Sequence, residues 1–536
     1  MSPFLLVVAV CIFFLISGIL VLSLRDIYGM EARIGLFVRA MLSGQGFFCP
    51  LLYNKPYPDY PPLYFLISWL FCNPIGHVCP VCISAPSLFS GTLLLIVLFM
   101  VSKSYIGQRA ALMSSVILVA SPKFWPMAQS ASIDMLLALF CLLANVSFFH
   151  GYCLEDGEGS RNARMLGFVF MSISYLVKGP IGLVISSLPT AVFLIIKRRT
   201  RLLACFFSFA LLSSAIVIGF YMAGIYSQGG LALVEQVLSA QLLSRISGQA
   251  NKPFYYYPVF LLLAFLPVFI LLGFIYQDRF ARAGRTFKQC LATEFSLFMA
   301  IFTISALLPF FFASSRHGRY LLPAFCPIAL LLSCFIAKSL ENEEKEIFPL
   351  LKWLSLGLVA TVYLIVPILY FWDPFHSSLP WWSIAGFFFI GTAVLGIFFL
   401  PKDDSLIMSS RFFLSVFFII LGISLGVQPG LSKRESGRQF VLMTESMVKA
   451  RMIFLAGFRP DGDGLKYSLY SRYYPNDIRF LPSLKNISLM PKASLLILYA
   501  KEFDGHKGKE INLDKFSIIS EGYIHSKKTI ALYKAL

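Results

Sequence analysis

The chain is organised around the segment from Arg25 to Tyr64, which reads RDIYGMEARIGLFVRAMLSGQGFFCPLLYNKPYPDYPPLY. It follows an apolar run, Phe4 to Leu24, and is the only polar-rich segment in the first hundred residues. Carboxylates and cations alternate in it with aromatic residues and prolines. At a membrane surface, a loop of this composition is suited to bind a charged headgroup and to supply a base.

The composition around this stretch is that of a polytopic membrane protein. Of the 536 residues, 58% are hydrophobic and 13% charged, with a mean hydropathy of +0.76, whereas soluble domains have about 25% charged residues. Many apolar runs have about the 17–22 residues that a bilayer core requires. The net charge of +18 lies largely in short loops, where the positive-inside rule explains it without nucleic acid.

The apolar runs predict an all-α membrane domain with thirteen spans. The first run has no basic start and no small-residue cleavage site, so we interpret it as an uncleaved helix. The basic loop Lys197–Arg201 is expected in the cytoplasm, which places the N-terminus inside. Pro61–Phe71 is too short to span and reads as an interfacial or re-entrant helix. The expected spans are 4–24, 84–102, 108–122, 131–150, 165–178, 180–196, 202–222, 256–276, 294–313, 320–337, 352–372, 381–400 and 411–427.

Two domains are expected. Residues 1–427 form the membrane domain, with a first outer loop at 25–83 and a further outer loop at 223–255. Residues 428–536 are more charged and form a small α/β domain on the extracytoplasmic side, with a helix near 464–474. Its expected strands are Met452–Ala456, Ile478–Leu481, Ser494–Tyr499, Phe516–Ile519 and Thr529–Tyr533.

Ionisable residues near membrane depth are candidates for function, because each costs roughly 2.5–3.5 kcal/mol to insert. Glu31 is a candidate base and Arg33 a candidate phosphate clamp, with an interfacial salt bridge as the alternative. Asp59 and Asp134 each stand near an expected helix start, where a carboxylate serves either as a cap or as part of a site.

Cations gather on the same expected face. Lys178 precedes the sharp turn Gly179-Pro180 and either faces an anionic headgroup or snorkels. Arg316-His317-Gly318-Arg319-Tyr320 is the densest positive cluster in a short outer loop, against the positive-inside pattern. Arg245 precedes a tyrosine run at 255–257 that also suits an aromatic belt. Without a P-loop or Rossmann pattern, these groups indicate one outer cavity for a lipid-linked phosphate.

The chain has eleven cysteines, mostly within apolar runs. Cys79-Pro-Val-Cys82 is the exception. We interpret this pair as small apolar residues near a helix start, with a disulfide on an oxidising face as the alternative.

Six motifs occur in a fixed order, and together they resemble bacterial aminoarabinose:lipid A transferases and protein O-mannosyltransferases. Both are GT-C glycosyltransferases that use polyprenyl-phosphate sugars. The motifs are Glu31-Ala32-Arg33, the run YPDYPPL at 57–63, Asp134 in SIDMLLALF, KGPIGL at 178–183, PFYYYP at 253–258 and RYLLPAFCPIALL at 319–331.

The resemblance implies a role for each site residue. Arg33, Lys178, Arg245 and Arg319 hold a donor or acceptor phosphate. Glu31 or Asp59 activates the acceptor, and Asp134 orients a cation or the sugar. The remaining substrate-binding residues are Tyr57, Tyr255, Tyr256, Arg316 and Tyr320.

The sequence departs from the family pattern at three places. Met30 stands where the family has an aspartate, Tyr60 replaces a lysine, and Ala250-Asn251 occupy the place of a histidine. That histidine holds a metal in the aminoarabinose branch, so no cofactor is assigned and a divalent metal stays open.

These observations predict an inner-membrane glycosyltransferase. It would move a sugar from undecaprenyl phosphate to an extracytoplasmic acceptor, lipid A or another envelope glycan. Its active site and C-terminal domain would face the periplasm. A Ser/Thr-directed mannosyltransferase, a flippase for a lipid-linked anion and a non-catalytic relative stay as alternatives.

Overall fold

The computed structural model describes residues 3–152, 158–243, 252–275, 280–312, 316–340, 357, 405–481, 490–502 and 516–534. In this part of the chain, seven helices are long and apolar enough to cross a membrane, or eight if one bent pair counts as a span. The chain is therefore a multi-pass membrane protein. Apart from residue 357, the expected spans 352–372 and 381–400 lie outside the described residues, as does the candidate residue Arg245.

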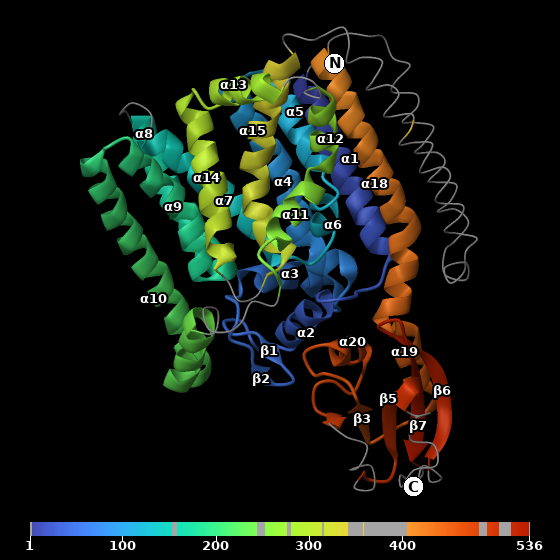
Figure 1. Cartoon of the computed structure of the whole chain (residues 1–536). Helices are drawn as coiled ribbons and strands as arrows, with labels where there is room; N and C mark the ends of the chain where they lie inside the picture. Colours follow the sequence, from blue (N-terminus) through green and yellow to red (C-terminus); the bar gives the residue numbers. More distant parts are fainter. Residues whose placement is uncertain are drawn as a thin grey trace.

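The other expected spans all fall on helices (Figure 1). Apart from the bent pair α11 and α12, two of these helices are short: at 1.5 Å per residue, α5 and α9 are about 18 and 25 Å long, against a bilayer core of about 30 Å. Within the described ranges the predicted thirteen full spans are therefore not reached. The helices are α1 (Pro3–Leu24), α4 (Pro80–Ile106), α5 (Gln108–Val119), α7 (Ile133–Tyr152), α8 (Glu158–Lys178), α9 (Pro180–Ile196), α10 (Thr200–Leu238), α11 (Tyr256–Ala264) with α12 (Leu266–Ile275), α14 (Glu294–Phe311), α15 (Leu322–Leu340) and α18 (Ser405–Ser436).

Two expected boundaries are wrong. The span 256–276 is not one helix, because α11 and α12 meet at an angle of 76°. Pro267, in the first turn of α12, lacks an N–H and clashes with the preceding turn, which explains the break. The loop expected from residue 223 is also wrong, since α10 continues to Leu238 across a kink at Gly229 and Gly230.

Three helices lie where loops were expected. They are α2 (Glu31–Leu42) in the first outer loop, the short α6 (Phe124–Ala128), and α13 (Phe280–Cys290) between α12 and α14. In α2 the apolar residues recur at helical spacing beneath the charges, and Ala32, Leu36 and Phe37 are fully buried. The short helix expected at 61–71 is confirmed as α3 (Leu63–Cys72).

One end of the bundle collects the polar elements. Figure 1 shows α2, α3 and the hairpin β1 (Leu51–Leu52) and β2 (Lys55–Pro56) at the same end as the C-terminal sheet, with α13 at the opposite end. The first outer loop and the C-terminal part, both expected outside, therefore share one end. Which side of the membrane this end faces stays a prediction.

The C-terminal part is a five-stranded mixed sheet in the order β4-β3-β5-β7-β6. β3 pairs in parallel with β4 and β5, while β7 pairs antiparallel with β5 and β6. All five predicted strands are confirmed, and the expected helix is α20 (Asp463–Tyr470), with α19 (Arg438–Met447) as an addition. The strands are β3 (Met452–Ala456), β4 (Ile478–Leu481), β5 (Ser494–Tyr499), β6 (Phe516–Ile524) and β7 (Lys527–Lys534).

The sheet part is fixed to the first outer loop by polar contacts. Arg39 at the end of α2 donates to the backbone carbonyls of Ser468, Leu469 and Ser471 at 3.2, 3.0 and 2.9 Å. Asp26 accepts from Arg438 at 3.1 Å. The C-terminal part therefore packs against the segment that follows the first span.

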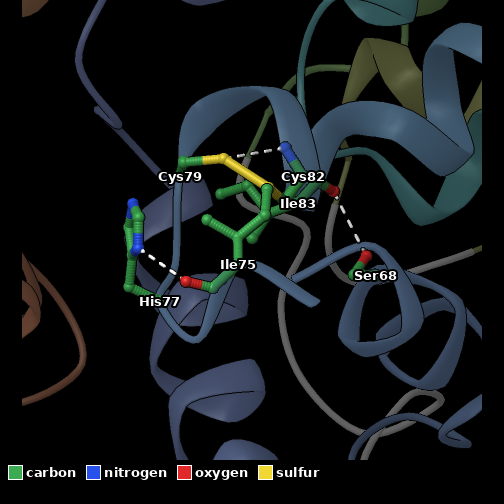
Figure 2. Close-up of a disulfide and its surroundings, with 6 residues drawn as sticks. All are labelled: Ser68, Ile75, His77, Cys79, Cys82 and Ile83. Atoms are coloured by element: carbon green, nitrogen blue, oxygen red, sulfur yellow. Dashed lines mark hydrogen bonds between the residues drawn. A yellow bond between two sulfur atoms is a disulfide. The ribbon is translucent and has the colours of Figure 1, made fainter. Parts of the chain in front are cut away.

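The interpretation of Cys79 and Cys82 as unlinked apolar residues is wrong. They form a disulfide at the start of α4, and Cys79 Sγ accepts from the backbone N–H of Cys82 at 3.3 Å (Figure 2). Beside it, Ser68 Oγ donates to the carbonyl of Ile83 at 3.2 Å, which joins α3 to α4. The alternative of a disulfide is the one that the structure shows.

Candidate functional site

A small charged cavity lies where α2, α3, the start of α7, the end of α8 and the turn before α15 meet. Its volume is about 40 Å³, far below the roughly 300–1,000 Å³ of pockets that enclose whole ligands. The cavity therefore suits one small polar group, not an entire sugar. Its polar and charged lining consists of Arg33, Tyr60, Asp134, Lys178 and Arg319, and Met30, Phe37 and Phe65 contribute apolar surface.

Asp134 organises the deep wall of this cavity. It stands in the first turn of α7 and its side chain is only 4% exposed. Its carboxylate pairs with Lys178 Nζ, and its second oxygen lies 3.5 Å from Arg319 Nε. Buried carboxylates are stable only when paired in this way. Of the two roles predicted for Asp134, the geometry favours orienting cations over capping.

Lys178 is delivered by the turn between two helices. α8 ends at Lys178 and α9 begins at Pro180, and Gly179 between them has φ of +74°, which favours glycine. Lys178 is almost fully buried, so it does not snorkel to water. Its Nζ lies 4.0 Å from the ring centroid of Tyr320, a cation–π contact that also positions it.

Arg33 closes the cavity from α2. Its Nη1 donates to the hydroxyl of Tyr57 at 2.7 Å and its Nη2 to the backbone carbonyl of Asp461 at 2.9 Å. Burial raises the pKa of Tyr57 above its usual range although Arg33 acts against this, so the phenol stays neutral. A hydrogen bond between Tyr57 and Asp59 acts in the same direction as burial. Arg33 thus links the cavity to the C-terminal part.

Three lining cations face a single lining carboxylate. Arg33, Lys178 and Arg319 carry three positive charges and Asp134 one negative charge, an excess of two. Lys178 is buried, whereas Arg33 is partly exposed and the side chain of Arg319 is 30% exposed. A cleft lined by an excess of one charge concentrates ligands of the opposite charge. The electrostatics of the cavity therefore favour a doubly charged anion such as a phosphate monoester.

Glu31 lies next to the cavity but is occupied. Its two oxygens accept from Arg25 Nη1 and Nη2 at 2.6 and 2.7 Å, and one also accepts from the N–H of Ala131 at 3.0 Å. The predicted role of Glu31 as a base stays a prediction. The sequence predicted no partner for Arg25. Its pairing with Glu31 explains why a cation stands at the expected outer end of the first span, where the positive-inside rule does not expect one.

Asp59 does not cap α3. The N-cap position is Pro62, without a side-chain hydrogen bond, so this alternative is wrong. Arg316 lies away from the lining and donates to the carbonyls of Lys252 and Phe311 at 2.7 and 3.1 Å. Its predicted contact with substrate therefore stays a prediction.

The predicted tyrosines also differ in whether they lie at the cavity. Tyr256 accepts from the N–H of Gly318 at 3.2 Å and so supports the turn that carries Arg319. Tyr255 is 57% exposed. Tyr60 was noted in the sequence only as a departure from the family pattern, yet it lines the cavity.

The described residues do not offer a divalent metal a suitable set of ligands. Among them, no three histidine, cysteine, aspartate or glutamate residues are grouped to hold an ion. The carboxylate of Asp134 already faces two cations. We therefore derive no step through a metal.

Comparison with known proteins gives consistent matches. Residues 59–226 match the family described as dolichyl-phosphate-mannose-protein mannosyltransferase. The undecaprenyl phosphate-alpha-4-amino-4-deoxy-L-arabinose arabinosyl transferase of Aeromonas hydrophila is 23% identical over 50% of this chain and 48% of its own length. The enzyme of the same name from Erwinia tasmaniensis is 24% identical over 60% and 58%, and that from Aeromonas salmonicida is 24% identical over 74% and 72%. The chain thus spans about half to three fifths of the length of the first two.

The likeness in fold extends over nearly the whole chain. The crystal structure of ArnT from Cupriavidus metallidurans bound to undecaprenyl phosphate superposes with a TM-score of 0.75, covering 98% of this chain and 97% of that one at 14% identity. Its apo state gives 0.74. At this identity the superposition shows the fold alone. In sequence and in fold, the chain resembles the GT-C glycosyltransferases of the protein mannosyltransferase and aminoarabinose transferase type.

Proposed function

We propose that the chain is a glycosyltransferase that uses a polyprenyl-phosphate sugar as donor. The observation that carries this proposal is the excess of two positive charges in the cavity formed by Arg33, Lys178 and Arg319 around Asp134. The names of the relatives, which include undecaprenyl phosphate and an aminoarabinose transfer, support the same donor class.

The reaction breaks the bond between the sugar's anomeric carbon and the phosphate oxygen and forms a new bond to an acceptor oxygen. The electron pair leaves with the polyprenyl phosphate, which gains negative charge as the bond breaks. Fixed cations in a site without water stabilise such a charge and reorganise little during the step. Lys178, held by Asp134 and Tyr320, and Arg319 are the residues placed for this task.

The acceptor decides whether a base is required. A phosphate acceptor is already ionised and carries no proton to be removed, whereas a hydroxyl must lose one. The carboxylate of Glu31 is held by Arg25 and that of Asp134 by two cations. This favours a phosphate-bearing acceptor such as lipid A. Because the positive-inside rule places the basic loop Lys197–Arg201 in the cytoplasm, we propose that the cavity, at the other end of the bundle, works at the periplasmic face of the inner membrane.

The test measures sugar transfer by the full chain in lipid nanodiscs, from an undecaprenyl-phosphate sugar to lipid A. We expect Arg319→Ala to lower the rate by a factor of about 10²–10³, the usual effect of losing one transition-state donor. Lys197→Ala is the matched control, because Lys197 forms an exposed ion pair with Glu294 at the far end of the bundle. Transfer at the wild-type rate by Arg319→Ala contradicts the proposal, and uptake of donor into vesicles without product favours a transporter.

Mass spectrometry of a deletion strain identifies the acceptor. Lipid A, surface glycans and envelope proteins are compared with those of the parent strain. We expect the loss of a glycosyl unit from lipid A. Its loss from a Ser/Thr-modified protein instead assigns the mannosyltransferase alternative.

A further inference from the structure

A second and larger cavity has no role in the function proposed so far. It lies between the segment 44–56 of the first outer loop and the end of α10 beyond its kink, and its volume is about 630 Å³. Every side chain that lines it is uncharged. Its size falls in the range of cavities that hold ordinary ligands, whereas the charged cavity, at about 40 Å³, does not.

The wall of this cavity is fixed by one glutamine. Gln228 on α10 accepts from the backbone N–H groups of Phe48 and Cys49 at 3.0 and 2.9 Å. Its amide nitrogen donates to the carbonyl of Cys49 at 2.8 Å. These three bonds hold the loop at a set distance from the helix, so the space between them is built into the fold.

The kink of α10 lies at the same place. Gly229 lines the cavity and has a non-helical conformation, and Gly230 follows with φ of +67°. A break in a helix frees backbone N–H and C=O groups from their helical partners. Near a membrane, such irregular backbone is tolerated where it is buried in protein or lines a water-filled cavity. The kink therefore supplies polar backbone to this space.

The side chains suit a carbohydrate. Gln45 and Gln236 are exposed at the cavity and carry amides, which both donate to and accept from hydroxyl groups. Asn54 is exposed there too, with its Nδ2 donating to Asn476 Oδ1 at 2.8 Å. Phe47 and Phe48 supply aromatic surface for the apolar face of a sugar ring. A ligand with a net charge would find no counter-charge among the lining residues. An uncharged sugar matches all three properties.

The two cavities are neighbours along the first outer loop. Pro56 lines the uncharged cavity and Tyr60 the charged one, and four residues span at most about 14 Å. Gln241 at the end of this helical region donates to the carbonyl of Pro58, between them, at 3.3 Å. One molecule can therefore reach both cavities. The donor's sugar is bonded directly to its phosphate, so the more distant cavity fits the acceptor.

We propose that this cavity binds an uncharged sugar unit of the acceptor while the charged cavity holds phosphate, an inference that rests on the transfer activity proposed above. Filling the cavity removes acceptor binding and leaves donor binding intact. Substitutions in the uncharged cavity should therefore affect the acceptor sugar, and substitutions in the charged cavity should affect the phosphate.

The test uses photolabelling, which requires no transfer. The full chain in lipid nanodiscs is irradiated with diazirine-bearing N,N′-diacetylchitobiose, an uncharged disaccharide, and labelled peptides are mapped by mass spectrometry. We expect labels within 44–56 and 227–236, and a loss of at least about tenfold in Ala232→Trp, which fills the cavity. Leu231→Trp is the matched control, because Leu231 is 64% exposed and does not line the cavity.

Competition separates the two possible sources of sugar. An excess of the donor, an undecaprenyl-phosphate sugar, is expected to leave the labelling unchanged, and unlabelled disaccharide to suppress it. Displacement by this donor, labels outside these peptides, or full labelling of Ala232→Trp overturns the proposal. If Ala232→Trp does not fold, Gln236→Leu replaces it, because this substitution adds no bulk. We expect Gln236→Leu to weaken labelling about fivefold. Labelling of this variant at the wild-type level overturns the proposal. Labelling does not require catalysis. A failure to label therefore refutes only the acceptor cavity, whereas transfer at the wild-type rate by Arg319→Ala refutes the transferase activity itself.

Discussion

Two buried carboxylates lie close together at one end of the bundle, and their surroundings differ in one respect. Glu31 meets a single cation, Arg25, and its charge is cancelled. Asp134 meets Lys178 and Arg319 beside a cavity that Arg33 also lines, and positive charge remains in excess. Glu31, neutralised by one cation, has a structural role. Asp134, outnumbered by cations, lies where an anion can bind.

The largest effect is expected from breaking the matched pair. Arg25→Ala leaves Glu31 buried and unpaired, which typically costs about 3–5 kcal/mol. We expect a markedly lower midpoint in thermal or denaturant unfolding of the purified chain. Lys197→Ala, which breaks an exposed pair, is expected to change stability by less than about 1 kcal/mol.

The double variant Arg25→Met with Glu31→Leu sharpens the comparison. Replacing both members by apolar residues of similar size removes the unpaired charge, so we expect most of the stability and the transfer activity to return. A stable double variant without transfer identifies Glu31 as the base, and the account of this pair as scaffold is then wrong.

The second effect concerns the cation-rich cluster. Lys178→Met is expected to lower the rate of transfer by about 10²–10³, because a fixed donor to the leaving phosphate is lost. Adding Asp134→Asn removes the buried charge and is expected to recover stability but not activity. Recovery of transfer in this double variant shows that the cluster only holds the helices together.

The sequence predicted some regions of the structure more completely than others. The five strands were predicted closely, because each is a short apolar run between turn residues and needs no knowledge of distant partners. The convergence of Arg33, Asp134, Lys178 and Arg319 was predicted from the alternation of loops between the two sides, which put these four residues on the same face. Their roles stay predictions.

The remaining features depend on tertiary contacts. Nothing local in the sequence says that Arg25 folds back on Glu31 or that Arg33 reaches the carbonyl of Asp461. The break before Pro267 did leave a signal, a proline within an apolar run, and hydropathy alone passed over it. The uncharged cavity depends on a helix that continues beyond its expected end.

A smaller effect is expected from the link between Tyr57 and Arg33. Tyr57→Phe removes the hydrogen bonds of the phenol with Arg33 and Asp59, each worth about 1 kcal/mol, and leaves Arg33 less well positioned. We expect about a fivefold weaker affinity for undecaprenyl phosphate, measured by binding in nanodiscs. Tyr53→Phe is the control, because Tyr53 bonds to Pro460 and Ser468 of the C-terminal part instead. An equal loss in both variants attributes the effect to docking of the sheet.

The smallest effect is a dependence on pH. Burial, together with Arg319 and Lys252, lowers the pKa of His317 below its usual value of about 6.5, although Asp134 acts against this. The unfolded chain then binds a proton more readily than the folded one, so the contribution of His317 to stability is complete above pH 6.5 and is lost as the pH falls below it. Unfolding midpoints from pH 8 to 5 are expected to decline less in His317→Asn, and parallel curves contradict this assignment.

The most direct measurement compares the affinities of the full chain in nanodiscs for undecaprenyl phosphate and for undecaprenol, which lacks the charge. We predict that the wild-type chain prefers the phosphate by at least about a hundredfold and that the double variant Lys178→Met, Arg319→Gln loses this preference while both proteins bind the alcohol equally. A preference that survives in the double variant contradicts the claim that the cation-rich cavity around Asp134 holds the lipid-linked phosphate.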